Sequence, residues 1–421
     1  MIFFNLFVEL FFKNKDLNKK IRFDFFNQHC FSLPHSANYD RFIGLRQFKR
    51  LIYKLWFSKK TTLINNFSNS NSASYLYDIS IENIQVKSNY VNKEAGDSIS
   101  GAFARNDFLF GLSIFNRILI SVLSLMIYPF ISFLVFFKKK NRINIALLPE
   151  LLIECSILIN LLLKVDCEKI YFFSTHEPEA NLLAHLLMKK NIKVVKIPNS
   201  NPLFMFNKNM VTDELILTLE YQFEEANLFY EDCDFEIKRW HPIGLNKYYN
   251  INKENQSSKK LCYYSHASWI RKSEDHHLPK FNEVELELNF LELIRNSNFF
   301  SNHEVYICLH PKEKTSSNIL IKSKNYYKKI FGSNVQFYNN SSFESFEEFE
   351  LGFGAFSSIL FERIHCGYKT LIFNNLISEF PILNSDFNYF VMSDFENLLE
   401  SIQCFVNENF DELTQRKYKY V

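Results

Sequence analysis

The chain has 421 residues, more than one hydrophobic core usually supports, so we expect two domains of ordinary size. Its 48 basic and 46 acidic side chains leave a formal net charge of +2, which is too balanced to mark a nucleic-acid-binding protein. The eight cysteines include no CxxC pair, a pattern that argues against zinc and disulfide frameworks and indicates a reducing, cytoplasmic location.

Residues 1–140 are predicted to form a mostly helical, apolar extension that completes the first domain. Residues 41–60 combine apolar side chains at helical spacing with a cationic remainder, which suits an anionic membrane surface or a helix packed on its own domain. Residues 118–137 are uncharged over about 20 positions, the length of a membrane span. Because Pro129 interrupts this run, we expect a buried helix or an in-plane or re-entrant membrane contact, with a single span as the alternative. The predicted location is therefore cytoplasmic and peripheral to the inner membrane.

After residue 140 short apolar segments alternate with helical ones, the rhythm of a parallel sheet. Strands are predicted at residues 143–148, 169–174 and 193–197, with helices at 150–164 and 178–190. These make a Rossmann-like domain over residues 141–245, expected to bind the acceptor. Strands at 260–265, 304–310 and 349–356, a helix at 282–295, another from Ser357 and a strand from Thr370 make a second Rossmann-like domain over 246–421. The predicted fold class is therefore α/β, with two such domains facing a cleft.

His310 follows a predicted strand of the second domain, at the edge of the sheet where open α/β proteins bind ligands. Its imidazole could donate a hydrogen bond to a phosphate or protonate a leaving group. Lys312, two residues later, could neutralise charge on the same phosphate. An isolated His-Pro pair is also compatible with an ordinary loop.

Ser357 and Ser358 stand at a predicted helix start, where free backbone N–H groups and the positive end of the dipole favour a phosphate. Gly352 and Gly354, just before them, would let the backbone approach a ligand closely. The alternative is that the serines only cap the helix. Glu362 lies four residues after Ser358, on the same helix face, and is a candidate for binding ribose hydroxyls; an exposed glutamate paired with a basic neighbour is the alternative.

The segments CLHPKEK and GFGAFSSILFERIHCGYKTLIF together resemble the bacterial sialyltransferases, which carry an HP motif after one strand of the C-terminal domain and a paired Ser/Thr motif further on. The resemblance covers residues 260–374 and extends to capsule and lipopolysaccharide transferases with the GT-B fold. It implies a GT-B-like chain that transfers a CMP-activated acidic sugar, such as sialic acid, by metal-independent inverting chemistry. His310 would act on the donor phosphate, and Ser357 and Ser358 would hold it.

The catalytic base is less well marked in the sequence. Those sialyltransferases carry an acidic pair followed by glycine in the N-terminal domain, and no such motif follows a strand here. An inverting reaction needs a group that deprotonates the acceptor hydroxyl. We predict Glu177 or Glu179, which follow the strand at 169–174; the alternative is that they are first-turn glutamates favoured by the helix dipole. Asp275, in a polar stretch that could also be a solvated loop, is the alternative base.

Two other functions are compatible with these motifs. A polymer phosphotransferase of the teichoic-acid type shares the two-domain architecture and would use a CDP-linked polyol donor. A non-catalytic assembly protein of the same fold is also allowed, because the acidic motif is missing. The expected partners are a nucleotide-sugar donor, a glycan or lipid-linked glycan acceptor and the inner membrane surface, with no cofactor, no metal and no nucleic acid.

Overall fold

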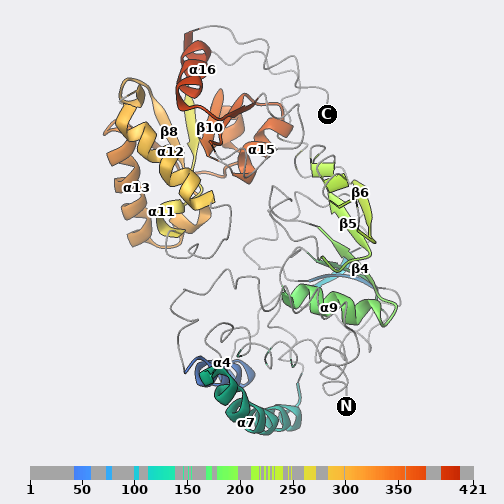
Figure 1. Ribbon diagram of the computed structural model, residues 1–421. Coiled ribbons are helices and arrows are strands. Elements are labelled where there is room, and N and C mark those ends of the chain that lie inside the picture. Colours follow the sequence, from blue (N-terminus) through green and yellow to red (C-terminus); the bar gives the residue numbers. More distant parts are fainter. Residues whose placement is uncertain are drawn as a thin grey trace. The chain divides into compact units, whose positions relative to one another are not determined.

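The computed structural model describes residues 42–57, 73–77, 99–103, 112–137, 167–172, 178–197, 210–217, 233–239, 260–271, 283–297, 299–355, 357–375 and 390–407, with isolated residues at 146, 150, 153, 219, 222–223, 226–227, 230–231, 245 and 248 (Figure 1). The chain divides into two compact units. Unit 1 contains residues 1–199, 203–218 and 226–243, and unit 2 contains 200–202, 219–225 and 244–421.

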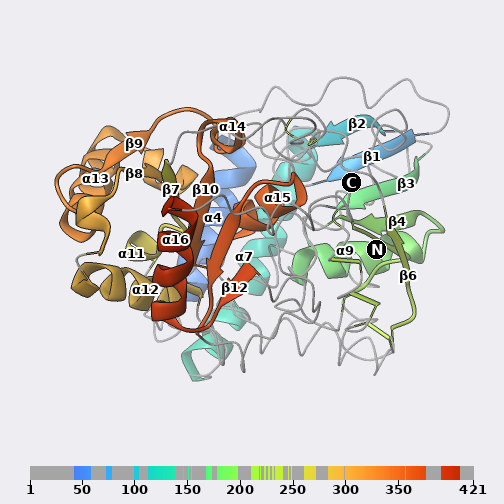
Figure 2. The ribbon, with the colours of Figure 1, turned by 90° about the horizontal axis from the view of Figure 1, so that it is seen from above.

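Unit 1 contains a six-stranded, all-parallel sheet in the order β2-β1-β3-β4-β5-β6. The strands are β1 (Ala73–Tyr77), β2 (Ile99–Phe103), β3 (Cys167–Phe172), β4 (Lys193–Lys196), β5 (Glu214–Leu217) and β6 (Glu236–Arg239). Helix α9 (Pro178–Met188) connects β3 to β4 and packs near β4 (Figure 2). Two of the strands, β1 and β2, therefore come from the N-terminal extension.

The strand predicted at residues 143–148 is wrong. Only Ala146 is described in this range, and it is helical. Short apolar runs fit a buried helix as well as a strand.

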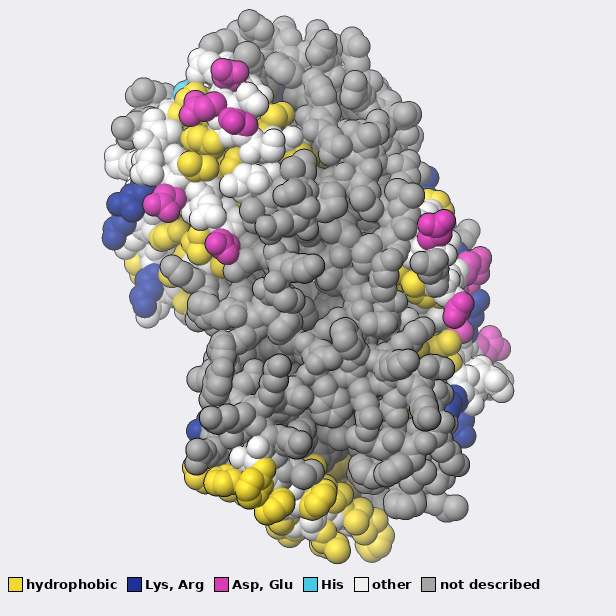
Figure 3. Space-filling view, in the orientation of Figure 1, with side chains coloured by type: hydrophobic (Ala, Val, Ile, Leu, Met, Phe, Trp, Pro, Cys, Tyr) yellow, Lys and Arg dark blue, Asp and Glu magenta, His cyan; other side chains and the backbone are white. Residues whose placement is uncertain are grey.

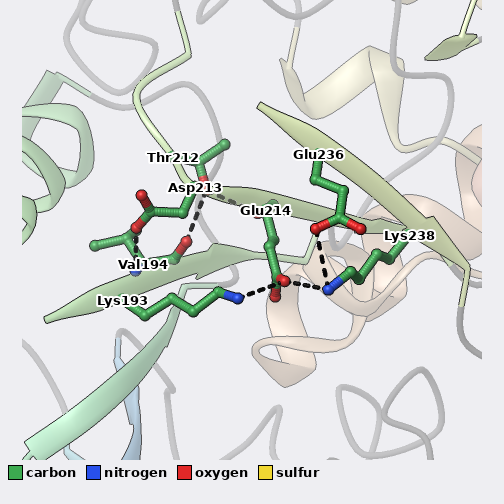
Figure 4. A network of polar contacts seen from close by, with 7 residues as sticks. All are labelled: Lys193, Val194, Thr212, Asp213, Glu214, Glu236 and Lys238. Carbon is green, nitrogen blue, oxygen red and sulfur yellow. Dashed lines mark hydrogen bonds and ion pairs between the residues drawn. The ribbon is translucent and has the colours of Figure 1, made fainter. Parts of the chain in front are cut away.

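A network of ion pairs joins the first residues of β4, β5 and β6 (Figure 4). The nearly inaccessible carboxylate of Glu214 contacts Lys193 Nζ at 2.6 Å and also Lys238 Nζ. Burial opposes ionisation of Glu214, but hydrogen bonds and charge from the two lysines outweigh it, so its pKa is lowered. This network lies at the amino ends of the strands. Open α/β sheets bind ligands at the opposite, carboxyl ends, so we assign the network to strand pairing.

Unit 2 contains a second six-stranded, all-parallel sheet in the order β12-β11-β10-β7-β8-β9. From β7 the chain moves outward to β9, returns to the other side of β7 at β10 and continues to β12. This is the Rossmann strand order, and it reverses between β7 and β10. The strands are β7 (Leu261–Tyr264), β8 (Val305–Cys308), β9 (Gln336–Tyr338), β10 (Leu351–Ala355), β11 (Thr370–Phe373) and β12 (Val391–Met392).

Helices connect these strands in the βαβ manner. Helices α12 and α13 pack side by side, and α15 packs on β10 and β11 (Figure 1). The helices are α11 (Ser268–Arg271), α12 (Glu283–Ser297), α13 (Ser317–Phe331), α14 (Ser345–Glu348), α15 (Ser358–His365) and α16 (Phe395–Asn407), with the 3₁₀ turns η6 (Phe299–Asn302) and η7 (Pro311–Lys314). The predicted α/β class, with two Rossmann-like units, is thereby confirmed.

Two further helices of unit 1, α4 (Ile43–Phe57) and α7 (Ile114–Phe137), pack against each other. Pro129 lies inside α7, so the expectation that it interrupts the helix is wrong. Residues Ile114–Phe133 are long and apolar enough to cross a membrane, and only 11% of this apolar stretch is buried. The prediction of a buried core helix is therefore also wrong.

Candidate active site

Three polar segments follow neighbouring strands of unit 2, at the point where the strand order reverses. His266 lies just after β7, His310 after β8 and Ser357 after β10, with β7 in the middle. Parallel strands are about 4.8 Å apart, so the ends of β8 and β10, which flank β7, are separated by roughly 10 Å. The carboxyl edge at a reversal of strand order is the preferred ligand site of an open α/β sheet.

His310 is held as the N-cap of η7. Its Nδ1 accepts a hydrogen bond of 3.1 Å from the backbone N–H of Lys312. Because Nδ1 is the acceptor, the neutral imidazole carries its proton on Nε2, which is therefore a hydrogen-bond donor. The ring of His266 lies 6.2 Å away, at 76° to it. The structure thus places two imidazoles on adjacent strand ends, and Lys312, two residues after His310, is exposed.

A buried carboxylate positions the His310 turn. Glu313 is fully buried, and one of its oxygens accepts from the His310 backbone N–H at 2.9 Å and from the Ser265 hydroxyl at 2.7 Å. Its other oxygen accepts from Trp269 Nε1 at 2.8 Å. Burial raises the pKa of Glu313, and the hydrogen bond from Ser265 acts in the opposite direction. Glu313 therefore ties the turn after β8 to the segment after β7.

The Ser265 hydroxyl continues this network into the core. It lies 2.6 Å from the hydroxyl of Tyr327, on α13, and accepts from the Ala267 backbone N–H at 2.9 Å. Since the Ser265 proton goes to Glu313, Tyr327 donates to Ser265. Ala267 adopts a φ of +62°, an unfavourable conformation for a residue other than glycine. The chain after β7 is thus held in a strained turn by its hydrogen bonds.

A second buried carboxylate holds the His266 segment. Glu287, on α12, accepts from the backbone N–H groups of His266 at 2.7 Å and Ser268 at 2.9 Å, and from the Tyr263 hydroxyl at 2.6 Å. Each of the two histidines therefore has its main chain fixed by a buried glutamate. We did not predict either role. The spacing of Glu313, three residues after an N-cap, is the sequence signal of a capping box and could have identified it.

Ser357 occupies the N-cap position of α15, but its side chain makes no capping hydrogen bond. The alternative prediction, that the Ser357 side chain only caps the helix, is therefore wrong. Ser357 is 7% exposed, and Ser358 is half-buried in the first turn. Both lie next to the free N–H groups of the helix start, where an anion binds most readily.

Glu362 is almost fully buried on α15, at 2% exposure. The alternative of an exposed glutamate paired with a basic neighbour is therefore wrong. Burial raises the pKa of Glu362 to about 8, so this side chain holds its proton at neutral pH. A protonated carboxyl can both donate and accept a hydrogen bond.

We expect Glu362→Gln to change how stability depends on pH. A carboxyl whose pKa is raised on folding favours the folded state below its unfolded pKa and loses that contribution as the pH rises through the folded value. The wild type should therefore lose stability between about pH 5 and pH 9, and the neutral glutamine variant should lose less, gaining a few kcal/mol relative to it. Urea unfolding at both pH values measures this; parallel pH profiles for the two proteins would contradict it.

At Gly352 and Gly354, the two glycines before the serines, the protein core leaves no room for a larger side chain. A Cβ atom on Gly352 would come within 2.6 Å of Arg363 Nε, and one on Gly354 within 2.9 Å of the Tyr264 carbonyl oxygen. Arg363 is fully buried and donates to carbonyl oxygens that include Phe346 O at 3.2 Å. The close approach that these glycines permit is thus to the protein core. Contact of Gly354 with a donor stays a prediction.

The structure describes little of the residues that we predicted as the catalytic base. Glu177 and Asp275 lie outside the described residues. Glu179 lies in the first turn of α9, which follows β3, but its side chain is not described. In the described part of the chain, no group of three His, Cys, Asp or Glu side chains is arranged to hold a metal ion.

Comparisons with known proteins give a fold-level likeness. No protein-family model matches the sequence, and the search of curated proteins found no match. Solved structures that are similar include a UDP-GlcNAc 2-epimerase from Neisseria meningitidis bound to UDP-GlcNAc, with 11% identity, a TM-score of 0.45 and coverage of 83% of this chain and 94% of that chain. A sucrose-phosphate synthase from Thermosynechococcus elongatus has 10% identity and a TM-score of 0.37 over 65% and 74% of the two chains. The wall teichoic acid polymerase TagF has 10% identity and a TM-score of 0.37 over 89% and 87%. Similarities of this size assign no activity.

Proposed function

We propose that the protein is a glycosyltransferase that uses a nucleotide-activated sugar bound at the carboxyl edge of the unit 2 sheet. The observation that carries the proposal is the convergence of His310 and the start of α15 on either side of the β7 end, where the strand order reverses. Both are groups that stabilise an anion. Two such groups, following strand ends about 10 Å apart at a Rossmann switch point, suit the phosphate and sugar of one nucleotide donor.

The donor phosphate is assigned to the first turn of α15. There the backbone N–H groups, the helix dipole and the hydroxyls of Ser357 and Ser358 can all donate to its oxygens. His310 donates through Nε2–H, and Lys312 adds a positive charge. These groups stabilise the charge that develops on the leaving phosphate, which is the largest contribution in many transferases.

The reaction in this proposal is an inverting substitution at the anomeric carbon. A base removes the proton of the acceptor hydroxyl, whose oxygen forms the new bond to the anomeric carbon. The bond from that carbon to the donor phosphate oxygen breaks, and its electron pair stays on the phosphate. His310 and Lys312 stabilise the resulting anion, so no metal is required in this scheme. The base candidates are Glu177 and Glu179, with Asp275 as the alternative.

Within this class we propose a CMP-activated acidic sugar as donor and a surface glycan or lipid-linked glycan as acceptor, as in capsule or lipopolysaccharide biosynthesis. The support is the pair of motifs around His310 and Ser357 that resembles bacterial sialyltransferases. A buried, protonated Glu362 on the same helix would avoid adding a negative charge beside the donor.

One observation favours a second candidate, a phosphotransferase that uses a CDP-linked polyol. His266 lies beside His310, so the site offers a second imidazole, at 6.2 Å between ring centroids. Two imidazoles could serve the two phosphates of a CDP donor, whereas a CMP-sugar has one phosphate. The identity of the bound nucleotide separates the two candidates.

Isothermal titration with CMP, CDP, UDP and GDP tests the proposal. Binding of CMP alone supports the CMP-sugar donor, and preferential binding of CDP supports the polyol phosphotransferase. UDP or GDP binding at this site would keep a transferase and change its donor. Binding of none of the four would contradict a nucleotide-dependent enzyme and favour a non-catalytic assembly role.

A further inference from the structure

Helices α4 and α7 pack antiparallel along their length. The rings of Phe48 and Tyr128 lie 5.2 Å apart, and Trp56 Nε1 donates to Ser121 Oγ at 3.1 Å. Near the other end of the contact, a Cβ atom on Gly44 would come within 2.8 Å of Ser132 Oγ. Contact through glycine and serine lets the two backbones approach closely, as is typical of helix pairs within membranes.

This helix pair exposes far more apolar surface than the rest of the described chain, although its interior also contains apolar side chains such as Leu51, Leu55 and Ile131. The buried side chains include Gln47, Ser124 and Tyr128, whereas the exposed ones are mainly large and apolar. In the described part of the chain, every exposed large apolar side chain except Ile321 belongs to α4, α7 or Phe42 just before α4. Figure 3 shows these apolar side chains gathered at the lower end of unit 1. Six that represent the α7 face are Ile118, Leu119, Val122, Met126, Phe130 and Phe133.

The charge of the pair fits an anionic partner. Neither helix contains an aspartate or glutamate, and α4 carries four cations, Arg46, Lys49, Arg50 and Lys54. Lys54 and Arg50 contact Glu150, and Lys49 borders an apolar groove of about 460 Å³ between the helices. A broad apolar face bordered by cations matches the acyl chains and anionic headgroups of a bilayer.

We propose that α4 and α7 form a monotopic membrane-docking surface that lies in the plane of an anionic bilayer. The cations of α4 occur over more than two turns in the middle of the helix. If α4 stood upright in the bilayer, Lys49 and Arg50 would enter the hydrocarbon, which is costly. In the plane of the membrane, the exposed cations Arg46, Lys49 and Arg50 stay at headgroup depth. Because α7 packs along α4, it lies in the same plane, and its apolar face enters the acyl-chain region.

Flotation of the full-length protein with vesicles tests this assignment. The wild type should float with phosphatidylcholine vesicles that contain phosphatidylglycerol, and less with phosphatidylcholine alone. The double variant Met126→Glu/Phe130→Glu places two carboxylates on the exposed α7 face, at side chains that are 72% and 63% exposed, and should weaken binding about a hundredfold or more. Ile321→Glu is the matched control, because Ile321 is 59% exposed but lies on α13. It should bind vesicles like the wild type.

Two further variants test charge and depth. Lys49→Gln should weaken binding to anionic vesicles about fivefold and leave binding to neutral vesicles unchanged. Lipids brominated in the upper acyl chain should quench Trp56 fluorescence, and this quenching should be absent in Trp56→Phe. The assignment is wrong if the wild type binds no vesicles, or if Met126→Glu/Phe130→Glu binds as well as the control. It is also wrong if the double variant only dissociates a wild-type dimer in sedimentation, since a second copy would then cover the face.

Discussion

Replacing His310 by alanine should lower donor turnover by about 10²–10⁴-fold, the contribution typical of a positioned acid or hydrogen-bond donor. Because the Lys312 N–H occupies Nδ1, the neutral imidazole of His310 carries its proton on Nε2, where it can be donated to the phosphate. Alanine removes both functions of the imidazole, the donor and the cap. The measurement is release of free nucleotide from the donor that the titration identifies, at saturating donor and acceptor.

His310→Asn is the matched variant. Asparagine is among the best N-cap residues, so it can retain the hydrogen bond that stabilises η7. Its shorter side chain has no donor at the position of the histidine Nε2–H, so it cannot reach the phosphate there. The asparagine variant should therefore unfold in urea like the wild type while losing nearly as much turnover as His310→Ala. Turnover of the asparagine variant within threefold of the wild type would show that His310 only shapes the turn.

Glu313→Gln should lower kcat about ten- to a hundredfold although Glu313 need not contact the substrate. Its two oxygens accept from Trp269, Ser265 and the His310 N–H, all of which are donors. An amide offers one oxygen, so its NH₂ group must face a donor, and leaving a buried group unsatisfied costs about 1–3 kcal/mol. The His310 turn should shift away from its productive position.

Glu287→Gln provides the comparison that separates positioning from general destabilisation. Glu287 also accepts three hydrogen bonds in the core, but it holds the His266 segment. Both variants should lose similar stability in urea. Glu313→Gln should also shift the pH profile of kcat, because the environment of His310 changes, whereas Glu287→Gln should leave that profile nearly in place. Equal kinetic effects in both variants would reduce the role of Glu313 to packing.

Much of the unit 2 architecture can be predicted because its strands are buried on both faces. The runs at β7, β8 and β11 are almost entirely apolar and are bounded by polar turns. Some of the strands that we did not predict are short, such as β9 and β12, or polar. For example, β6 reads EIKR and carries two of the charged side chains of the Glu214 network. Its assignment depends on pairing with β5, which the local pattern does not reveal.

The candidate site, like the sheet of unit 2, can be predicted only in part from the sequence. His310 and Ser357 could be placed on one edge of the sheet because both follow predicted strands. The strand order, which puts β7 between them, could not be read from the sequence. Glu313 and Arg363 look like surface charges in the sequence, and both are fully buried. Their burial is stabilised by partners far away along the chain, such as Trp269 and Tyr264, which a local pattern does not contain.

We propose that a nucleotide binds at the start of α15 in unit 2. Titration of the nucleotide bound by the wild type into the double variant Ser357→Ala/Ser358→Ala tests this most directly, because Ser357 makes no capping hydrogen bond and its loss should leave the helix intact. We expect affinity to fall at least tenfold, with urea unfolding unchanged. Unchanged affinity in a folded double variant would place the nucleotide elsewhere and contradict the assignment.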